Sequence, residues 1–261
     1  MQLKASCELA FLNDGPVPMV MMLRPRSGAG QWVSAESFDA RPATDASEYV
    51  DIYGNLCQRI VGPPGEFRIC ATANVRVADA VDSAPGLLPT PIEMLPDNVL
   101  HYLLASRYCE SDKLQELANE VTQPAASQGW DQVELIRSRV HDNVAYESGA
   151  STSSTSALDT VEQRAGVCRD MAHVGIALTR AMDIPARMVV GYLYGLKPID
   201  LHAWFEAYIG TQWYVFDPKE DETLGGRIVL GYGRDAADVA LATQFGTSQL
   251  LDMRVSVERA E

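Results

Sequence analysis

The stretch AGVCRDMAHVGIALTRAM, residues 165–182, has the pattern of a long helix that begins at a cysteine. Its apolar side chains recur at spacings of four, three, four and four residues, which is typical of one buried helical stripe. Gly166 precedes Cys168 by two residues, where we expect it to let the chain turn sharply and to leave room for a substrate. The stripe consists of Val167, Met171, Val174, Leu178 and Met182.

The position of Cys168 favours a reactive thiol. A helix N-terminus carries about half a positive charge and several unpaired N–H groups. A thiol placed there is shifted toward the thiolate, which is the nucleophilic form. The alternative is that Cys168 is a small buried hydrophobic residue, as most cysteines are. The remaining cysteines have no such setting and are interpreted as core or incidental residues: Cys7, Cys57, Cys70 and Cys109.

A nucleophilic cysteine needs a base, and the chain has four histidines. His173 lies on the same helix as Cys168 but about 140° around its axis, so it does not face the thiol. His101 and His141 stand in helical patterns far upstream and are interpreted as surface or capping residues. His202, which opens the strand pattern HAWFEAYI, is therefore the best candidate for the base.

Residues 201–218, LHAWFEAYIGTQWYVFDP, read as a β-hairpin. If Gly210 and Thr211 form a type II′ turn, which requires glycine first, Asp217 lies opposite the residue two positions after His202. His202 and Asp217 then share one face as diagonal neighbours, roughly 7–8 Å apart along the backbone and within reach of each other's side chains. The alternative is that Asp217-Pro218 only ends a strand.

Cysteine, histidine and aspartate can also bind metals, but zinc ligands usually come in closely spaced pairs. Here successive candidates are 34 and 15 residues apart, so we expect no metal. No glycine-rich phosphate loop stands in the right context, and we expect no cofactor.

The composition is that of a globular protein, with 261 residues of which 47% are hydrophobic. The formal net charge of −14 argues against nucleic acids and anionic membranes as partners. No apolar run is long enough to span a bilayer, the N-terminus lacks a signal-peptide core, and five widely spaced cysteines favour a reduced, cytoplasmic protein. The oligomeric state stays open.

The predicted organisation has three parts. Short alternating runs separated by turn residues indicate an all-β domain over residues 1–84. Four prolines in residues 84–96 mark a linker, which we place at 85–96. Residues 97–261 then form an α+β core, with helices capped by Asp97 and Ser111, and a final strand.

The motifs GVCRDMAHVGIALTRAMDIPARMVVGY, HAWFEAYI and WYVFDP resemble the core of the transglutaminase-like superfamily of papain-like cysteine enzymes, in its bacterial branch. The resemblance implies that the cysteine helix packs on an antiparallel sheet, and that an N-terminal β module precedes this core. It implies Cys168 as nucleophile, His202 as base and acid, and Asp217 as the residue that orients the imidazole. Tyr146 and the backbone N–H of Cys168 are candidates for binding the oxyanion.

The resemblance implies acyl transfer through a thioester, on a protein or peptide substrate. We expect hydrolysis of a peptide or carboxamide, because no long lid that would exclude water is evident. One alternative is a transglutaminase with an amine acceptor, and another is a non-catalytic binding scaffold. Four acidic residues near the triad in the sequence could attract an amine: Asp170, Asp200, Glu206 and Asp221.

Overall fold

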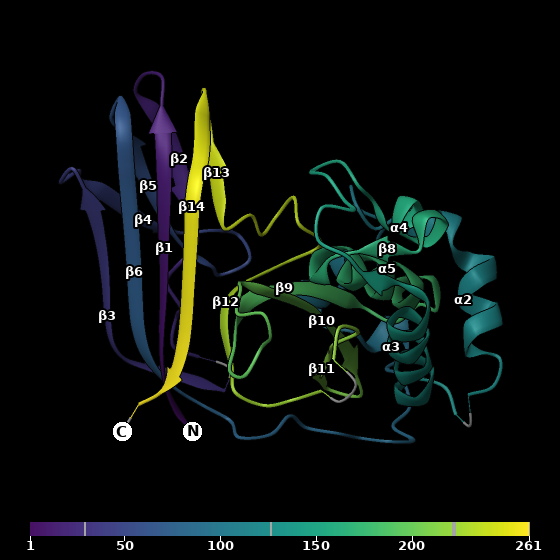
Figure 1. Ribbon diagram of the computed structural model, residues 1–261. Coiled ribbons are helices and arrows are strands. Elements are labelled where there is room, and N and C mark those ends of the chain that lie inside the picture. The colour runs from purple at the N-terminus through teal and green to yellow at the C-terminus, as the bar shows by residue number, and fades with distance from the viewer. Residues whose placement is uncertain (29, 126, 221–222, 261) are drawn as a thin grey trace.

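The computed structural model describes residues 1–28, 30–125, 127–220 and 223–260. Two antiparallel sheets lie against each other in the N-terminal part (Figure 1), with strand orders β14-β1-β6-β3 and β13-β2-β5-β4. Alternate side chains of the long strands are buried between them, as period-two patterning predicts. The strands are β1 Gln2–Asn13, β2 Val17–Met21, β3 Gln31–Arg41, β4 Ala46–Val50, β5 Leu56–Gly62, β6 Gly65–Val77, β13 Ala242–Gln244 and β14 Ser248–Arg259.

The C-terminal strand lies in the N-terminal sheet, whereas the sequence placed it in the core of residues 97–261. β14 pairs antiparallel with β1 from Leu3 opposite Arg259 to Asn13 opposite Ser248. β13 likewise pairs with β2. The edge of β1 not occupied by β6 offers a full row of backbone hydrogen-bonding groups, which the returning chain satisfies. The expected boundary is therefore corrected: the β sandwich takes strands from both ends of the chain.

The second half of the fold is a four-stranded antiparallel sheet, order β11-β10-β9-β12, with helices packed on one face (Figure 1). The cysteine-bearing helix α5 packs directly on β10 and β9. The approach is close, because a Cβ added at Gly175 of α5 would lie 2.4 Å from the Phe205 ring of β10. The elements are α2 Gln115–Thr122, α3 Trp130–Asn143, α4 Ala157–Gln163, α5 Cys168–Ala181, β9 Ala186–Leu193, β10 His202–Ile209, β11 Gln212–Phe216 and β12 Arg227–Gly233.

Helix α5 begins at Cys168, as the sequence predicts, and is the central element of the core. Every residue from Asp170 to Ala181 is buried, so the helix is enclosed on all sides rather than along one stripe. Met182, expected in the stripe, is only partly buried because the helix ends at Ala181. A helix this enclosed holds its first residue rigidly in place.

The proline-rich linker runs beneath the core toward the helices (Figure 1). It is packed rather than free, since the carbonyl of Leu87 accepts a hydrogen bond from the Trp130 amide. The predicted caps are wrong: Asp97 lies inside a helix of four residues that follows Pro96, and Ser111 begins a short turn that precedes α2, whose N-cap is Leu114. The remaining elements are η1 Ile92–Met94, α1 Asp97–Leu100, η2 His101–Leu103, η3 Ser111–Lys113, β7 Ala145–Tyr146 and β8 Ala165–Gly166.

No helix among the described residues has both the length and the apolar character needed to cross a membrane.

Candidate active site

Three elements of the core bring together the predicted site residues. Cys168 is the first residue of α5, His202 is the first residue of β10, and Asp217 directly follows β11. Because α5 packs on β10, and β10 pairs with β11, the three side chains meet at one end of the sheet. The fold therefore assembles the cluster from positions far apart in sequence.

The hairpin that carries His202 and Asp217 has the predicted register. Ile209 pairs with Gln212, which leaves a two-residue turn. Gly210 has φ +63, and Thr211 is not among the described non-glycine residues with positive φ. These angles match a type II′ turn, and they place the two site residues on one face.

His202 and Asp217 form a short, buried contact. His202 Nε2 lies 2.6 Å from Asp217 Oδ2, and both side chains are fully buried. The other ring nitrogen, Nδ1, makes no hydrogen bond within the described residues, which leaves it for the thiol. Burial alone lowers the pKa of His202, but the charge and hydrogen bond of Asp217, and then the nearby Cys168 thiol, outweigh burial and raise it to about 9.

Asp217 has a second cationic partner that the sequence analysis missed. Arg227 at the start of β12 places Nη2 2.8 Å from Asp217 Oδ2. Burial raises the pKa of Asp217, but the charges of His202 and Arg227 outweigh it and hold the pKa well below its usual range. The Lys219 amide donates to Oδ1 at 3.1 Å. The carboxylate is thus kept ionised and fixed in position.

Trp204 connects His202 to Arg227 on the face of the sheet away from α5. Its ring stacks on the imidazole, with centroids 5.9 Å apart and planes inclined by 30°. The Arg227 guanidinium lies 4.9 Å from the centre of the same ring. The imidazole is therefore held by a carboxylate on one edge and an aromatic ring on one face.

Comparisons with known proteins place the chain in a family. The family model of the transglutaminase-like superfamily matches residues 115–218, a range that includes Cys168, His202 and Asp217. An uncharacterized protein of Mycobacterium tuberculosis (strain ATCC 25618 / H37Rv) is 30% identical over 246 residues, covering 83% of this chain and 77% of that protein. The chain belongs to the transglutaminase-like superfamily.

Two further comparisons cover most of this transglutaminase-like chain. A protein of Mycobacterium leprae (strain TN) is 28% identical over 239 residues, covering 84% of this chain and 82% of that one. A crystal structure from Cytophaga hutchinsonii, of a protein named as a candidate cysteine protease, has 34% identity and a TM-score of 0.93. It covers 100% of this chain and 91% of that one, so the likeness extends over the β sandwich as well as the core.

The entry to the nucleophile helix is held by Asp170, which corrects the expected role of Gly166. Asp170 is fully buried, and its Oδ2 accepts a hydrogen bond from the Val167 amide at 2.9 Å. A Cβ at Gly166 would lie 2.8 Å from the Cβ of Asp170, and Gly166 is not among the glycines with positive φ. The glycine therefore makes room for this capping carboxylate, not for a sharp turn or a substrate.

Tyr146 lies beside the nucleophile in this transglutaminase-like core. Strand β7 pairs parallel with β8, which sets Tyr146 opposite Gly166, two residues before Cys168. Burial raises the pKa of the Tyr146 phenol, and the charge of Cys168 raises it further. Tyr146 is 42% exposed, so part of its side chain is open to a substrate.

Two of the four acidic residues expected near the site are paired with arginines. Asp170 faces Arg169 at 2.7 Å, and Glu206 faces Arg187 at 2.6 Å. Asp200 is partly buried and close enough to Tyr146 to act on its pKa. Asp221 lies outside the described residues. Two of the four carboxylates are therefore committed to arginines and are not free to attract an amine.

The other three histidines make contacts within the fold and lie outside the candidate triad. His173 is fully buried, its Nε2 accepts from the Ala236 amide at 3.1 Å, and burial lowers its pKa to about 4. His101, expected at the surface, is half-buried against Tyr102. His141, also half-buried, places Nδ1 3.0 Å from the carbonyl oxygen of Pro218. No group of three or more His, Cys, Asp or Glu within the described ranges is arranged to hold a metal ion.

Proposed function

We propose that this protein is a cysteine-dependent enzyme that breaks amide bonds through a thioester, and that it hydrolyses a peptide or carboxamide. One observation carries the proposal: His202 bonds Asp217 through Nε2 at 2.6 Å and keeps Nδ1 for Cys168. A nucleophile, a base and a residue that orients the base are the parts that acyl transfer requires. A non-catalytic binding scaffold does not require this arrangement of nucleophile, base and orienting residue.

The first half of the reaction uses the proton held by His202. Cys168 gives its thiol proton to His202 Nδ1 as its Sγ attacks the carbonyl carbon, and the carbonyl oxygen takes the negative charge. At neutral pH the imidazole keeps this proton because its pKa is raised to about 9. His202 Nδ1 then gives its proton to the departing nitrogen, the C–N bond breaks, and an amine leaves while the acyl group stays on sulfur.

The developing oxyanion has two proposed partners. The Cys168 backbone N–H stands at the N-terminus of α5, where the helix dipole stabilises negative charge. The Tyr146 hydroxyl is the second, on the strand next to the entry of α5. In the second half, His202 takes a proton from water, the water oxygen attacks the thioester, and a carboxylic acid leaves as sulfur is released.

The choice of water over an amine is supported by the state of the acidic residues. A cross-linking enzyme needs free negative charge to draw in a lysine-like amine, but Asp170 and Glu206 each face an arginine. Water at about 55 M outcompetes a dilute amine unless the site excludes it. Hydrolysis is therefore the outcome we propose.

The test supplies glutamine-containing peptides together with an isotope-labelled primary amine and analyses the products by mass spectrometry. Free acid or cleaved peptide as the main product supports hydrolysis, and an amine adduct as the main product would establish a transglutaminase instead. Cys168→Ala is the control, because every product must disappear with the nucleophile. No product, combined with an unreactive Cys168, would favour the scaffold.

A further inference from the structure

Asp217 lies just beyond the end of the core sheet. The last pair of the β10–β11 ladder is Phe205 opposite Phe216, so Asp217 is one residue past it. A proline follows, and proline has no backbone N–H with which to extend the ladder. The position of this carboxylate therefore depends on side-chain contacts and on the turn formed by residues 218–220.

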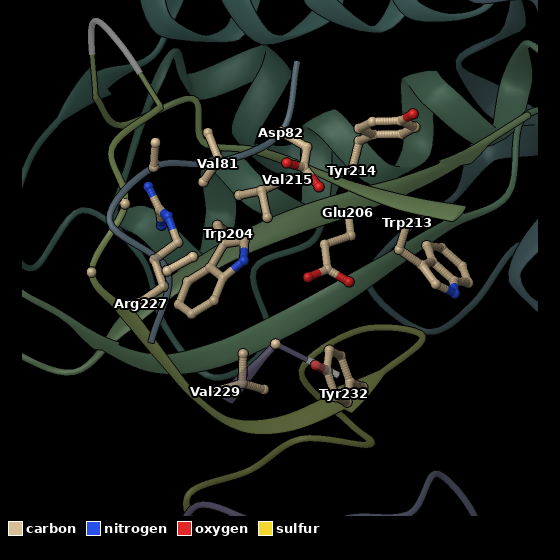
Figure 2. Close-up of a pocket in the computed structure, with 15 residues that line it drawn as sticks. Val81, Asp82, Trp204, Glu206, Trp213, Tyr214, Val215, Arg227, Val229 and Tyr232 are labelled. Atoms are coloured by element: carbon tan, nitrogen blue, oxygen red, sulfur yellow. The ribbon is translucent and has the colours of Figure 1, made fainter. Parts of the chain in front are cut away.

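The two oxygens of the Asp217 carboxylate are held by different groups. Oδ2 contacts two cationic side chains, Arg227 at 2.8 Å and His202 at 2.6 Å. Figure 2 shows Arg227 beside Trp204, along a pocket on the face of the sheet away from α5. Oδ1 accepts a hydrogen bond from the Lys219 amide at 3.1 Å. Because that amide belongs to the turn, Oδ1 is held in place only if the turn itself is fixed.

Helix α3 fixes this turn with two side chains from one of its faces. His141 Nδ1 lies 3.0 Å from the Pro218 carbonyl oxygen, and Nδ1 is the donor because a carbonyl can only accept. Arg137 Nη1 donates to the Glu220 carbonyl at 3.0 Å. Residues four apart on a helix lie on the same side, so the two donors bind the first and last residues of the turn together.

Both donors are carried by a rigid part of the core. The Arg137 side chain is only 10% exposed, and its Nε and Nη2 each lie 2.8 Å from a carboxylate oxygen of Glu134. Helix α3 packs on α5 and on β11. Its first residue, Trp130, meets the Tyr214 ring edge-on, with centroids 4.9 Å apart. The position of the helix is therefore passed on to the turn that follows Asp217.

We propose that His141 and Arg137 are positioning residues of the active site, which act on Asp217 through the turn 218–220. The inference rests on the proposed function. The two side chains hold the turn, the turn amide holds Oδ1, and the carboxylate orients His202. A misplacement of about 1 Å caused by a change far from the chemistry can cost about 10²-fold in rate, so these remote contacts matter for turnover.

The test compares two replacements of His141. Asparagine places an amide nitrogen close to the position of Nδ1 and keeps the donor, whereas leucine removes it. We expect His141→Leu to lower kcat for a cleavable peptide about tenfold, with KM within about twofold, and His141→Asn to stay within about twofold of wild type. Arg137→Met removes the second donor and should lower kcat in the same way. Arg139→Met is the control, because Arg139 is an exposed arginine of the same helix.

A second measurement needs no turnover. In an NMR titration we expect the pKa of His202 to fall from about 9 to about 8 in His141→Leu and Arg137→Met, because Asp217 faces the imidazole less well. It should stay near 9 in His141→Asn and Arg139→Met. If the wild type cleaves no amide, the proposed function fails, and this titration still decides the role of α3.

Three outcomes would overturn the proposal. The first is an unchanged kcat and His202 pKa in folded His141→Leu and Arg137→Met. The second is a His141→Asn variant as impaired as His141→Leu, because the donor would then be irrelevant. The third is the failure of both His141→Leu and Arg137→Met to fold, judged by circular dichroism, which would assign the two contacts to stability alone.

Discussion

Two buried arginine–carboxylate pairs lie side by side on the same face of the core sheet, and they are built differently. Arg187 directs both Nε and Nη2 at Glu206, at 2.8 and 2.6 Å, and its guanidinium is enclosed by the rings of Trp213 and Tyr232. Arg227 instead reaches Asp217 through one nitrogen and leaves another without a partner among the described residues. We call the first pair closed, because Arg187 binds Glu206 through two nitrogens. We call the second pair open, because Arg227 Nη1 has no partner among the described residues and Asp217 also bonds His202.

The open pair is the one that belongs to the candidate triad. Its carboxylate divides one oxygen, Oδ2, between Arg227 and His202. A closed pair serves folding, because each charge satisfies the other and nothing remains for a substrate or a base. An open pair costs stability and keeps hydrogen-bonding capacity for chemistry. Neighbouring arginine–carboxylate pairs can therefore be assigned different roles from their hydrogen bonds.

The largest expected effect comes from Asp217→Asn. The amide keeps the size of the side chain but not the charge that orients and stabilises the His202 imidazolium. We expect turnover of a cleavable peptide to fall about 10³–10⁴-fold, as it does when the aspartate of a catalytic triad becomes an amide. Rates measured on protein shown to be folded by circular dichroism test this. Full activity in the variant, together with none in Cys168→Ala, would refute the triad.

Glu206→Gln is the matched change in the closed pair. It leaves the buried Arg187 without its anion, which should lower the free energy of unfolding by about 3 kcal/mol. Turnover by the folded fraction should stay within about twofold of wild type, because Glu206 does not contact His202. Urea unfolding monitored by fluorescence gives the stability, and the peptide assay gives the rate. A large loss of turnover without loss of stability would erase the distinction between the pairs.

Much of the site could be predicted from local sequence. Gly210 in a two-residue turn determines which residues of the hairpin face each other, so local turn chemistry is enough to place His202 and Asp217 on one face. The helix beginning at Cys168 follows from apolar spacing. Both are short-range consequences of chain geometry, and the fold contains both as expected.

Local sequence could not predict the contact of Arg227 with Asp217 or the pairing partner of β14. Arg227 acts across strands, and nothing local marks it except that it is the only charged residue of the strand RIVLGYG. The side chains of β14 are mostly exposed or half-buried, so its pattern indicates a strand without indicating a partner. Which free edge a returning strand joins depends on the whole fold, here on the open edge of β1.

His202 offers a direct readout of the open pair. We expect its NMR titration to give a pKa near 9 in the wild type and below about 6.5 in Asp217→Asn, where burial persists without the compensating charge. Because the folded pKa is raised, the linked stability is fully present below about pH 6.5 and is lost as the pH rises through 9. This loss should shrink in Asp217→Asn and stay unchanged in Glu206→Gln. An unchanged His202 pKa in Asp217→Asn would contradict the assigned hydrogen bond.

The smallest effect separates two cysteines that are similarly accessible. Cys168 and Cys70 are the two partly exposed cysteines among the described residues, and the other three are buried. Burial, and then the charges of Glu8 and Asp39, raise the pKa of the Cys70 thiol and slow its reaction. Cys168 stands at the α5 N-terminus beside the His202 imidazolium, the setting in which protein thiols react fastest. We expect iodoacetamide at neutral pH to alkylate Cys168 about tenfold faster than Cys70, as read by peptide mapping.

The advantage of Cys168 over Cys70 in alkylation rate should shrink in Asp217→Asn, where His202 loses its proton, and persist in Glu206→Gln. Equal labelling of the two cysteines in the wild type would show that exposure alone sets reactivity and that the triad does not activate its thiol.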